Sequence, residues 1–177
     1  MVVYSRNLNA NEVFAGYDAL SQPAESYGNS EQVEYMWARS AYEHAEIHYD
    51  LLLSVDAKLL RLTPIDEEIY KHFKEQFPDF KLDVISEDFL KSPQQKELWR
   101  EFCEQYKTRI ENYNFATLLR LRCDQDYSPD NTTLAPRIQF YAIEIARNRE
   151  GLNDEIRKKI KTELPPQTQS LNNNEKQ

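Results

Sequence analysis

A long stretch without helix-breaking residues constrains this chain more than any other feature. The run from Glu31 to about Leu53 contains neither glycine nor proline, and Asn29 stands where it can cap a helix. At about 100° per residue, most of its apolar side chains gather on one broad face. The opposite side carries three tyrosines spaced by seven residues, Tyr35, Tyr42 and Tyr49. A helix that is contacted on two sides lies inside a fold, so we expect this helix to be central.

A narrow wedge of the same helix is uniformly charged, and it holds Arg39, Glu43, Glu46 and Asp50. Residues 1–56 carry two basic and nine acidic side chains, so most of the net charge of −8 lies in this third of the chain. We therefore expect Glu43, Glu46 and Asp50 to bind a basic protein surface. The alternative is an internal role, in which Arg39 pairs with an acid one turn away. Nucleic acid is not an expected partner, because its phosphates would be repelled.

Two further helices have start signals in which a hydroxyl residue precedes a proline. These signals are Thr63-Pro64 and Ser92-Pro93, and each hydroxyl is expected to cap its helix. The apolar spacing predicts that the second helix continues to about Asn112. Trp37 and Trp99 fall on the apolar faces of their helices, so we expect both side chains to be mostly buried.

The hydrophobic period changes to two from Phe115 to Cys123, which predicts a strand. A lone strand cannot satisfy its backbone groups, and residues 132–134 are its expected partner across a turn. Pro136 then starts a helix that Gly151 closes, with a strand through residues 138–145 as the competing interpretation. The predicted fold is a compact single domain, mainly α with a minor β-hairpin (α+β).

The expected organisation is an N-terminal arm over residues 1–19, a globular domain over residues 20–163 and a disordered polar tail over residues 164–177. Cys103 and Cys123 form neither a CxxC motif nor a disulfide framework, which favours a reducing compartment. The sequence shows no signal peptide and no apolar run near the roughly 18 residues that a membrane span needs. We expect a cytoplasmic protein without membrane contact, and the nucleus is a second expected location.

Histidines at positions 44 and 48 give the sharpest chemical signal, because two imidazoles four residues apart on a helix can share a zinc ion. The metalloprotease pattern needs glutamate directly after the first histidine, whereas Glu46 is rotated off that face. We therefore interpret His44 and His48 as hydrogen-bonded packing residues and expect no metal. The chain has only three glycines, so it contains no glycine-rich phosphate-binding loop, and no cofactor is expected. We predict no catalytic residues.

Three arginines on an otherwise apolar segment form a second candidate site. They are Arg137, Arg147 and Arg149. Arginine in such a setting clamps a carboxylate through two parallel hydrogen bonds, so these residues are candidates for partner binding. An internal salt bridge is the alternative role for each of them.

Several stretches resemble the small eukaryotic family named polysaccharide biosynthesis domain-containing protein 1. They are LSQPAESYGN at residues 20–29, WARSAYEHAE at 37–46, NFATLLRL at 114–121 and APRIQFYAIEIARNREGLN at 135–153. The resemblance extends from about residue 20 to residue 153, and the last stretch is long enough to be specific.

The resemblance implies a function that composition does not show. Relatives close to this chain are linked to the biogenesis of translation elongation factor 1-alpha, as dedicated chaperones that bind its nascent GTP-binding domain at the ribosome. The implied protein is a non-enzymatic chaperone, with that domain as client and ribosome-associated factors as further partners. Distant plant relatives look like methyltransferases of polysaccharide biosynthesis, so a methyltransferase-like transferase is the alternative. This chain lacks the glycine-rich loop that such a cofactor site would require.

Overall fold

A computed structural model describes the backbone of residues 31–163 and the side chains of residues 34–158. The predicted arm, the cap at Asn29 and the predicted tail lie outside the described residues. The elements follow in the order α2 (Glu31–Ser54), η2 (Ala57–Leu59), α3 (Asp66–Gln76), α4 (Glu87–Leu90), α5 (Pro93–Glu104), β1 (Ala116–Arg120), η3 (Pro129–Asn131), β2 (Thr132–Pro136), α6 (Arg137–Glu150) and α7 (Asp154–Glu163). The predicted fold class, a mainly helical domain with one hairpin, is confirmed.

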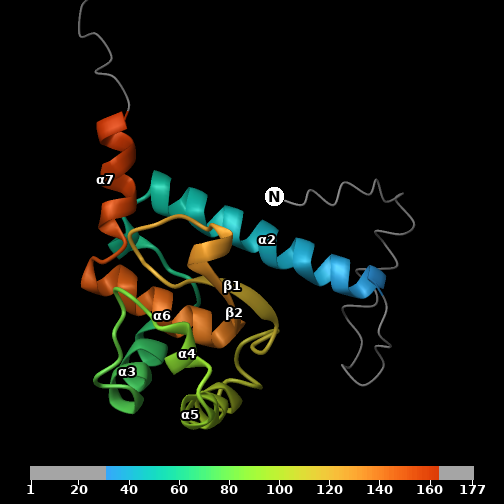
Figure 1. The fold of residues 1–177 in the computed structure, drawn as a ribbon. Coiled ribbons are helices and arrows are strands. Elements are labelled where there is room, and N and C mark those ends of the chain that lie inside the picture. The colour runs from blue at the N-terminus through green and yellow to red at the C-terminus, as the bar shows by residue number, and fades with distance from the viewer. Residues whose placement is uncertain (1–30, 164–177) are drawn as a thin grey trace, which may run out of the picture.

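Helix α2 has the predicted length but not the predicted place. It lies across one side of the domain, over the hairpin, and its N-terminal end extends past the hairpin (Figure 1). It packs on β1 and α7 through a single buried face. That face carries Ala41, Ala45, His48 and Leu52. The prediction that α2 is central is therefore wrong. Trp37, the residue after Met36, is 41% exposed, so the prediction that its side chain is mostly buried is wrong as well.

Helix α6 is the central element of the domain. It packs against α3, α5, η2 and both strands, and ten of its residues are buried. A helix that is surrounded on all sides carries apolar residues all round, which is why the segment could also be interpreted as a strand. Pro136 precedes the helix, and Gly151 ends it with a left-handed φ of 75°. The strand interpretation of residues 138–145 is wrong.

The hairpin pairs β1 and β2 in antiparallel register, with Leu118 opposite Leu134 and Arg120 opposite Thr132. Beyond Arg120 the chain of β1 leaves β2 and meets the segment before α4, where Ile85 N–H donates to the Leu121 carbonyl at 2.9 Å. Among the described residues, none of the helices has the length and apolar character needed to span a membrane.

The starts and ends of α3 and α5 follow the sequence only in part. Ser92 caps α5 as predicted, and its hydroxyl accepts from the Gln95 N–H at 3.4 Å. The cap predicted at Thr63 is wrong: helix α3 begins at Asp66 with Ile65 at the cap position, and the Asp66 carboxylate accepts hydrogen bonds from Leu62 N–H and Thr63 N–H. Helix α5 ends at Glu104, eight residues before the predicted end, and the chain continues in turns.

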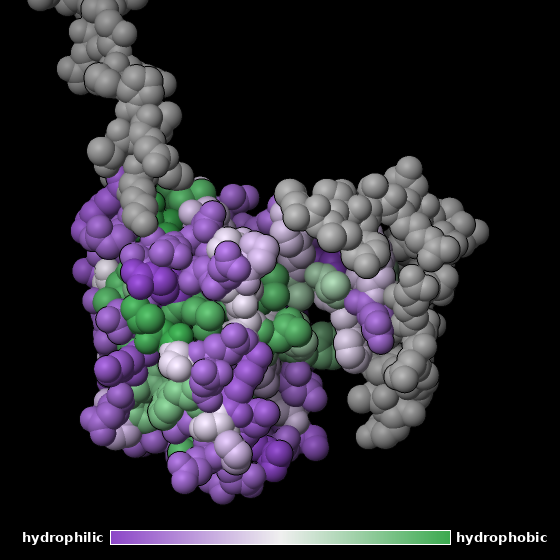
Figure 2. Space-filling model, viewed as in Figure 1, coloured by the Kyte–Doolittle hydropathy of each residue, from purple (hydrophilic) through white to green (hydrophobic). Residues whose placement is uncertain are grey.

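The main hydrophobic core lies between α3, α5 and α6. Trp99 is 3% exposed, as predicted, and its ring stacks on Phe77 with 4.2 Å between centroids. Phe73, Phe102 and Phe80 also belong to this aromatic cluster, at 5.9 Å, 5.4 Å and 5.8 Å from Trp99. On the face shown in Figure 2, apolar side chains form a band over α6 and the hairpin, and polar side chains cover much of the remaining surface.

Candidate partner-binding groove

A groove of about 560 Å³ lies between the outer side of α2 and the loop that joins β1 to β2. Its lining combines acids, tyrosines and apolar side chains: Tyr42, Glu43, Ala45, Glu46, Ile47, Tyr49, Asp50, Asp126 and Tyr127. The helical residues recur every three or four positions, so they share one side of α2. We refer to this site as the acidic groove. It contains all three acids that the sequence predicted as a partner-binding set.

The acids and the exposed apolar side chains alternate along the groove. Tyr42 is 56% exposed and Ile47 is 63% exposed, although both are large and carry much apolar surface. Glu46 and Asp50 are exposed beside them. The adjacent carboxylate of Glu46 raises the pKa of Tyr42, which indicates that the two side chains interact. Exposed apolar groups ringed by charge are typical of protein-binding surfaces.

Glu43 also has the internal partner that the sequence offered as an alternative. Arg39 Nε donates to Glu43 Oε1 at 2.7 Å, across one turn of α2. Both side chains are more than 40% exposed, so this surface pair contributes little to stability. Glu43 therefore remains accessible to a partner, which would compete with Arg39 for its carboxylate.

Tyr127 fixes the far wall of the acidic groove. Its hydroxyl lies 2.8 Å from His48 Nδ1 on the buried face of α2, and its ring meets Tyr49 edge-on. Burial raises the pKa of Tyr127, so the hydroxyl stays protonated. This contact holds the loop against α2 and places Asp126, the fourth acid, on the groove. Asp126 could not be assigned to this site from the sequence, because a loop residue has no periodicity that places it on a helix face.

Behind the groove lies a buried ionic network on β1 and α6. Arg120 Nη2 donates to Glu144 Oε2 at 3.0 Å, and Arg147 Nη1 donates to Glu144 Oε1 at 2.8 Å. All three side chains are fully buried. Arg147 also donates to the carbonyls of Leu82, Arg120 and Leu121. Arg147 is inaccessible to a partner in this fold, which corrects its place among the partner-binding candidates, and its role is the internal one.

The network also explains how a carboxylate stays ionised in the core. Burial opposes the ionisation of Glu144, but the guanidinium groups of Arg120 and Arg147 outweigh it and hold the pKa of that carboxyl well below its usual range. Asn153 Nδ2 donates to Glu144 Oε2 at 2.9 Å, and Asn153 Oδ1 accepts from Arg120 at 2.7 Å. The network therefore ties β1, α6 and the start of α7 together.

His44 and His48 make the contacts of packing histidines. His44 Nδ1 lies 3.0 Å from Thr117 Oγ1, and both rings meet Phe140 edge-on at 4.9 Å and 5.0 Å. Burial lowers the pKa of each histidine to about 4, which keeps both rings neutral near pH 7. Within residues 34–158, no group of three His, Cys, Asp or Glu side chains is placed to hold a metal ion.

The two remaining arginine candidates lie apart from the acidic groove. Arg137 is half-buried with its guanidinium over the Phe115 ring, 5.7 Å from the centroid. Arg149 lies at the other end of α6, where it donates to Glu67 Oε2 at 2.5 Å and covers the Tyr70 ring at 4.9 Å. Arg149 thus forms the internal salt bridge that was the alternative role, through one hydrogen bond to Glu67 of the same chain and not through a two-point clamp. The predicted acids form one site, and the predicted arginines do not.

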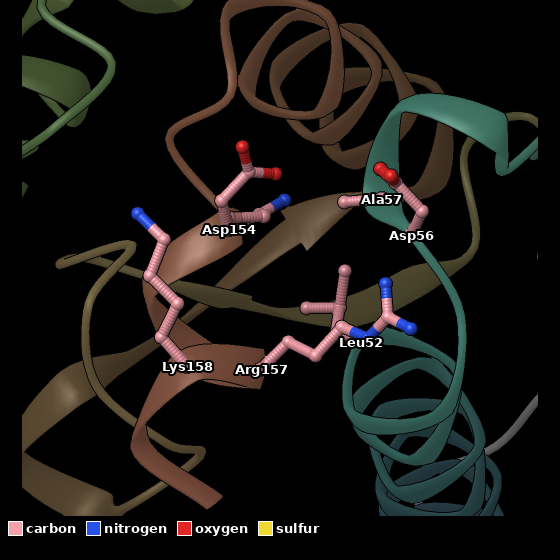
Figure 3. A pocket seen from close by; sticks show the side chains of 7 residues that line it. Leu52, Asp56, Ala57, Asp154, Arg157 and Lys158 are labelled. Carbon is pink, nitrogen blue, oxygen red and sulfur yellow. The ribbon is translucent and has the colours of Figure 1, made fainter. Parts of the chain in front are cut away.

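A smaller pocket of about 180 Å³ lies where the end of α2 meets α7. Figure 3 shows Asp154, Arg157 and Lys158 extending from α7, with Arg157 reaching toward Leu52 and Asp56 at the end of α2. Acids and bases are equally represented among the charged side chains that line it, so the lining favours neither an anion nor a cation. We interpret this pocket as part of the junction between the two helices.

Comparison with known proteins identifies close relatives. Residues 33–158 match the model of a family described as PBDC1 protein. Human Protein PBDC1 is 48% identical over 147 residues, which are 83% of this chain and 63% of the human protein. The Saccharomyces cerevisiae Protein PBDC1 homolog is 44% identical over 137 residues, which are 75% of this chain and 94% of that protein. The chain therefore spans slightly less than two thirds of the human relative.

A solved structure shares the fold. The solution NMR structure of protein yst0336 from Saccharomyces cerevisiae is similar with a TM-score of 0.71 and 43% sequence identity. The similarity covers 77% of this chain and 97% of that chain. The arrangement of helices around one hairpin is therefore shared with an experimental structure.

Proposed function

Because this chain belongs to the PBDC1 protein family, we propose that it is a non-enzymatic chaperone of the cytosol, with the nucleus as a second location. Its proposed client is the nascent GTP-binding domain of translation elongation factor 1-alpha, and ribosome-associated factors are its proposed further partners. This is the role that the family resemblance implies. The contact surface that we assign to the client is the acidic groove.

The acidic groove is the observation that supports a client-binding role. Four carboxylates surround the exposed parts of Tyr42 and Ile47, and the backbone beneath them is a regular helix. Acids at this density accelerate the approach of a basic client, and the apolar side chains supply contact area once it has docked. Because the backbone of a helix does not have to reorder on binding, this surface is preorganised for its partner.

The chemistry of the thiols is consistent with a protein that has no nucleophilic catalyst. Burial raises the pKa of the Cys103 thiol to about 12, and it also raises the pKa of Cys123. Both thiols therefore stay protonated near pH 7, and neither supplies a thiolate nucleophile. The alternative function is a transferase that uses S-adenosylmethionine. Thermal unfolding with saturating S-adenosylmethionine separates the two, because a bound cofactor raises the midpoint and a chaperone shows no shift.

Charge reversal tests the proposed contact surface. We expect the variant E43K/E46K/D50K to associate with the GTP-binding domain at least roughly tenfold more slowly than the parent at low salt, because the steering charge is inverted. The parent should lose association rate as salt rises, and the variant should not. Biolayer interferometry at several salt concentrations measures the association rates of the parent and of the variant.

A matched control separates local from global charge. The variant D79K/E101K/E111K makes the same change in net charge at exposed positions outside the groove. We expect it to keep most of the parent's association rate. Equal slowing in the two variants would show that only net charge matters, and unchanged rates in E43K/E46K/D50K would remove the acidic groove from the proposal.

A further inference from the structure

A second groove of about 590 Å³ lies on another part of the surface. It is bounded by residues 58–64, which include part of η2, by α3 and by the C-terminal end of α6. Its lining combines three basic side chains, two acids, and further polar and apolar residues: Lys58, Leu59, Leu60, Arg61, Thr63, Pro64, Asp66, Glu67, Tyr70, Ile145, Asn148 and Arg149. We refer to it as the basic groove. It shares no residue with the acidic groove.

The charges of the basic groove leave positive groups available. Among the described residues Arg61 has no ion-pair partner within 4.0 Å, and it is exposed. Lys58 has only a loose contact with Asp154, at 3.6 Å. The acids of the lining are already engaged. Asp66 accepts three hydrogen bonds from Leu62 and Thr63, and Glu67 pairs with Arg149.

An unsatisfied donor lies at the floor of the same groove. Asn148 is 3% exposed, and its Nδ2 has no hydrogen-bond partner within the part of the chain that the structure describes. Its Oδ1 accepts from Asn153 at 2.7 Å, so the amide orientation is fixed and Nδ2 faces away from that contact. Buried amide donors without an acceptor are rare in native proteins, so Asn148 Nδ2 is a donor that a partner bound in this groove would satisfy.

The geometry points to the basic groove as a binding site for an acidic segment of another protein, in which carboxylates alternate with apolar side chains. A carboxylate of that segment is received by Arg61 and Lys58 at the rim, and an oxygen acceptor reaches Asn148 at the floor. Leu59, which is 75% exposed, and Tyr70 receive the apolar side chains. The site is independent of the proposed client surface, so the chain can hold two partners of opposite charge.

The lining favours a peptide over a phosphate ligand. Glu67 and Asp66 place two carboxylates beside the bound anion, which penalises the double charge of a phosphate more than the single charge of a carboxylate. Leu59, Leu60 and Pro64 also offer apolar surface that an inorganic anion would leave exposed. Charge complementarity and apolar contact together select the acidic, partly apolar peptide.

A labelled peptide built from repeats of Glu-Leu-Asp tests the site by fluorescence anisotropy with the full chain. We expect saturable binding, and roughly tenfold weaker binding by R61E, since a repulsive charge replaces an attractive one. L59S should also weaken binding. In NMR spectra of the labelled protein, the side-chain amide signals of Asn148 should shift on addition of the peptide, because Nδ2 gains an acceptor.

Two controls decide between this site and general charge attraction. K96E makes the same charge change at an exposed position of α5 that lies outside the groove. This variant should bind the peptide like the parent. A peptide of repeated Gln-Leu-Asn should not bind. The inference is overturned if R61E binds as tightly as K96E, if the Asn148 amide signals do not move, or if inorganic phosphate displaces the peptide at stoichiometric concentration.

Discussion

The two halves of the buried interior are stabilised by different physical means. On the side of α3 and α5, the aromatic cluster around Trp99 excludes water with large rings and needs no particular hydrogen bonds beyond the helices. On the side of β1 and α7, the interior holds Arg120, Glu144 and Arg147, whose charges must be paired with correct geometry. Burial of rings adds stability in proportion to area, whereas buried ions are stable only as a complete set.

This difference predicts different responses to damage. An aromatic core loses stability gradually, because neighbouring side chains relax into part of a cavity. An ionic core fails when any member is removed, because the remaining ions are left without a counter-charge in a region that excludes water. The same contrast applies to pH, because the ionic half depends on a carboxylate that must stay ionised in the core.

The largest effect is expected from neutralising the centre of the ionic network. E144Q should lower the free energy of unfolding by about 4–5 kcal/mol, since two guanidinium groups then share the core without a negative charge. The matched control is E150Q on the same helix, where Glu150 pairs with Lys74 at the surface. That variant should stay within about 0.5 kcal/mol of the parent in urea unfolding. Similar losses in both variants would remove the distinction between the two kinds of ion pair.

Removal of the central ring of the aromatic cluster should have a somewhat smaller effect. We expect W99A to cost about 3–4 kcal/mol, because Phe77 and Phe73 lose a stacked partner and can fill only part of the cavity. W37A provides the control at a tryptophan that is 41% exposed, and it should cost less than about 1 kcal/mol. Equal unfolding midpoints for the two variants would contradict the packing described for the aromatic cluster.

A pH dependence of stability is expected from the histidines of α2, of which His48 lies 3.8 Å from Glu144. Burial lowers the pKa of His48 from 6.5 to about 4, so the unfolded chain binds a proton more readily than the folded chain between these values. Stability is therefore full above pH 6.5 and falls as the pH drops toward 4, by about 3 kcal/mol for His48 alone. His44 acts in the same direction, because burial lowers its pKa as well.

The carboxyl at the centre of the network responds in a lower pH range. The folded pKa of Glu144 lies well below 4.5, so its contribution is present above pH 4.5 and is lost as the pH falls further. The test is urea unfolding of the parent and H48Q at a series of pH values. H48Q should reduce the slope of the profile between pH 6.5 and 4, where His44 still contributes, and leave the further loss from Glu144 at lower pH unchanged. Identical profiles for the two proteins would show that His48 does not titrate on unfolding.

Regular patterns allowed much of the fold to be predicted. The Gly- and Pro-free run gave α2, the period of two gave β1, and Pro136 with Gly151 bounded α6. The spacing of apolar residues could not predict how much of each helix face is buried by neighbouring elements. Trp37 and Met36 are neighbours in sequence, yet Met36 is 2% exposed and Trp37 is 41% exposed. The family resemblance, by contrast, was confirmed without any knowledge of packing.

The candidate sites were predicted only where they lie on a single element. Glu43, Glu46 and Asp50 share one side of α2, so helical spacing brought them together. Asp126 joins them through a tertiary contact that no local pattern encodes. Arg147 and Arg149 are two residues apart, yet one is in the ionic network and the other is over Tyr70. Their different roles follow from the packing of α6, which sequence spacing does not specify.

The junction of α2 with α7 has a consequence for the order in which the domain can fold during synthesis. Ile156 of α7 forms a small cluster with Leu52 and Ala57, which precede it by about a hundred residues. Asn153 likewise reaches both Arg120 and Glu144. The ribosome synthesises Asn153 after Arg120 and Glu144, so these two charged residues leave the ribosome before their neutral hydrogen-bond partner is available. A pause in translation before residue 153 would therefore leave Arg120 and Glu144 without their contacts to Asn153.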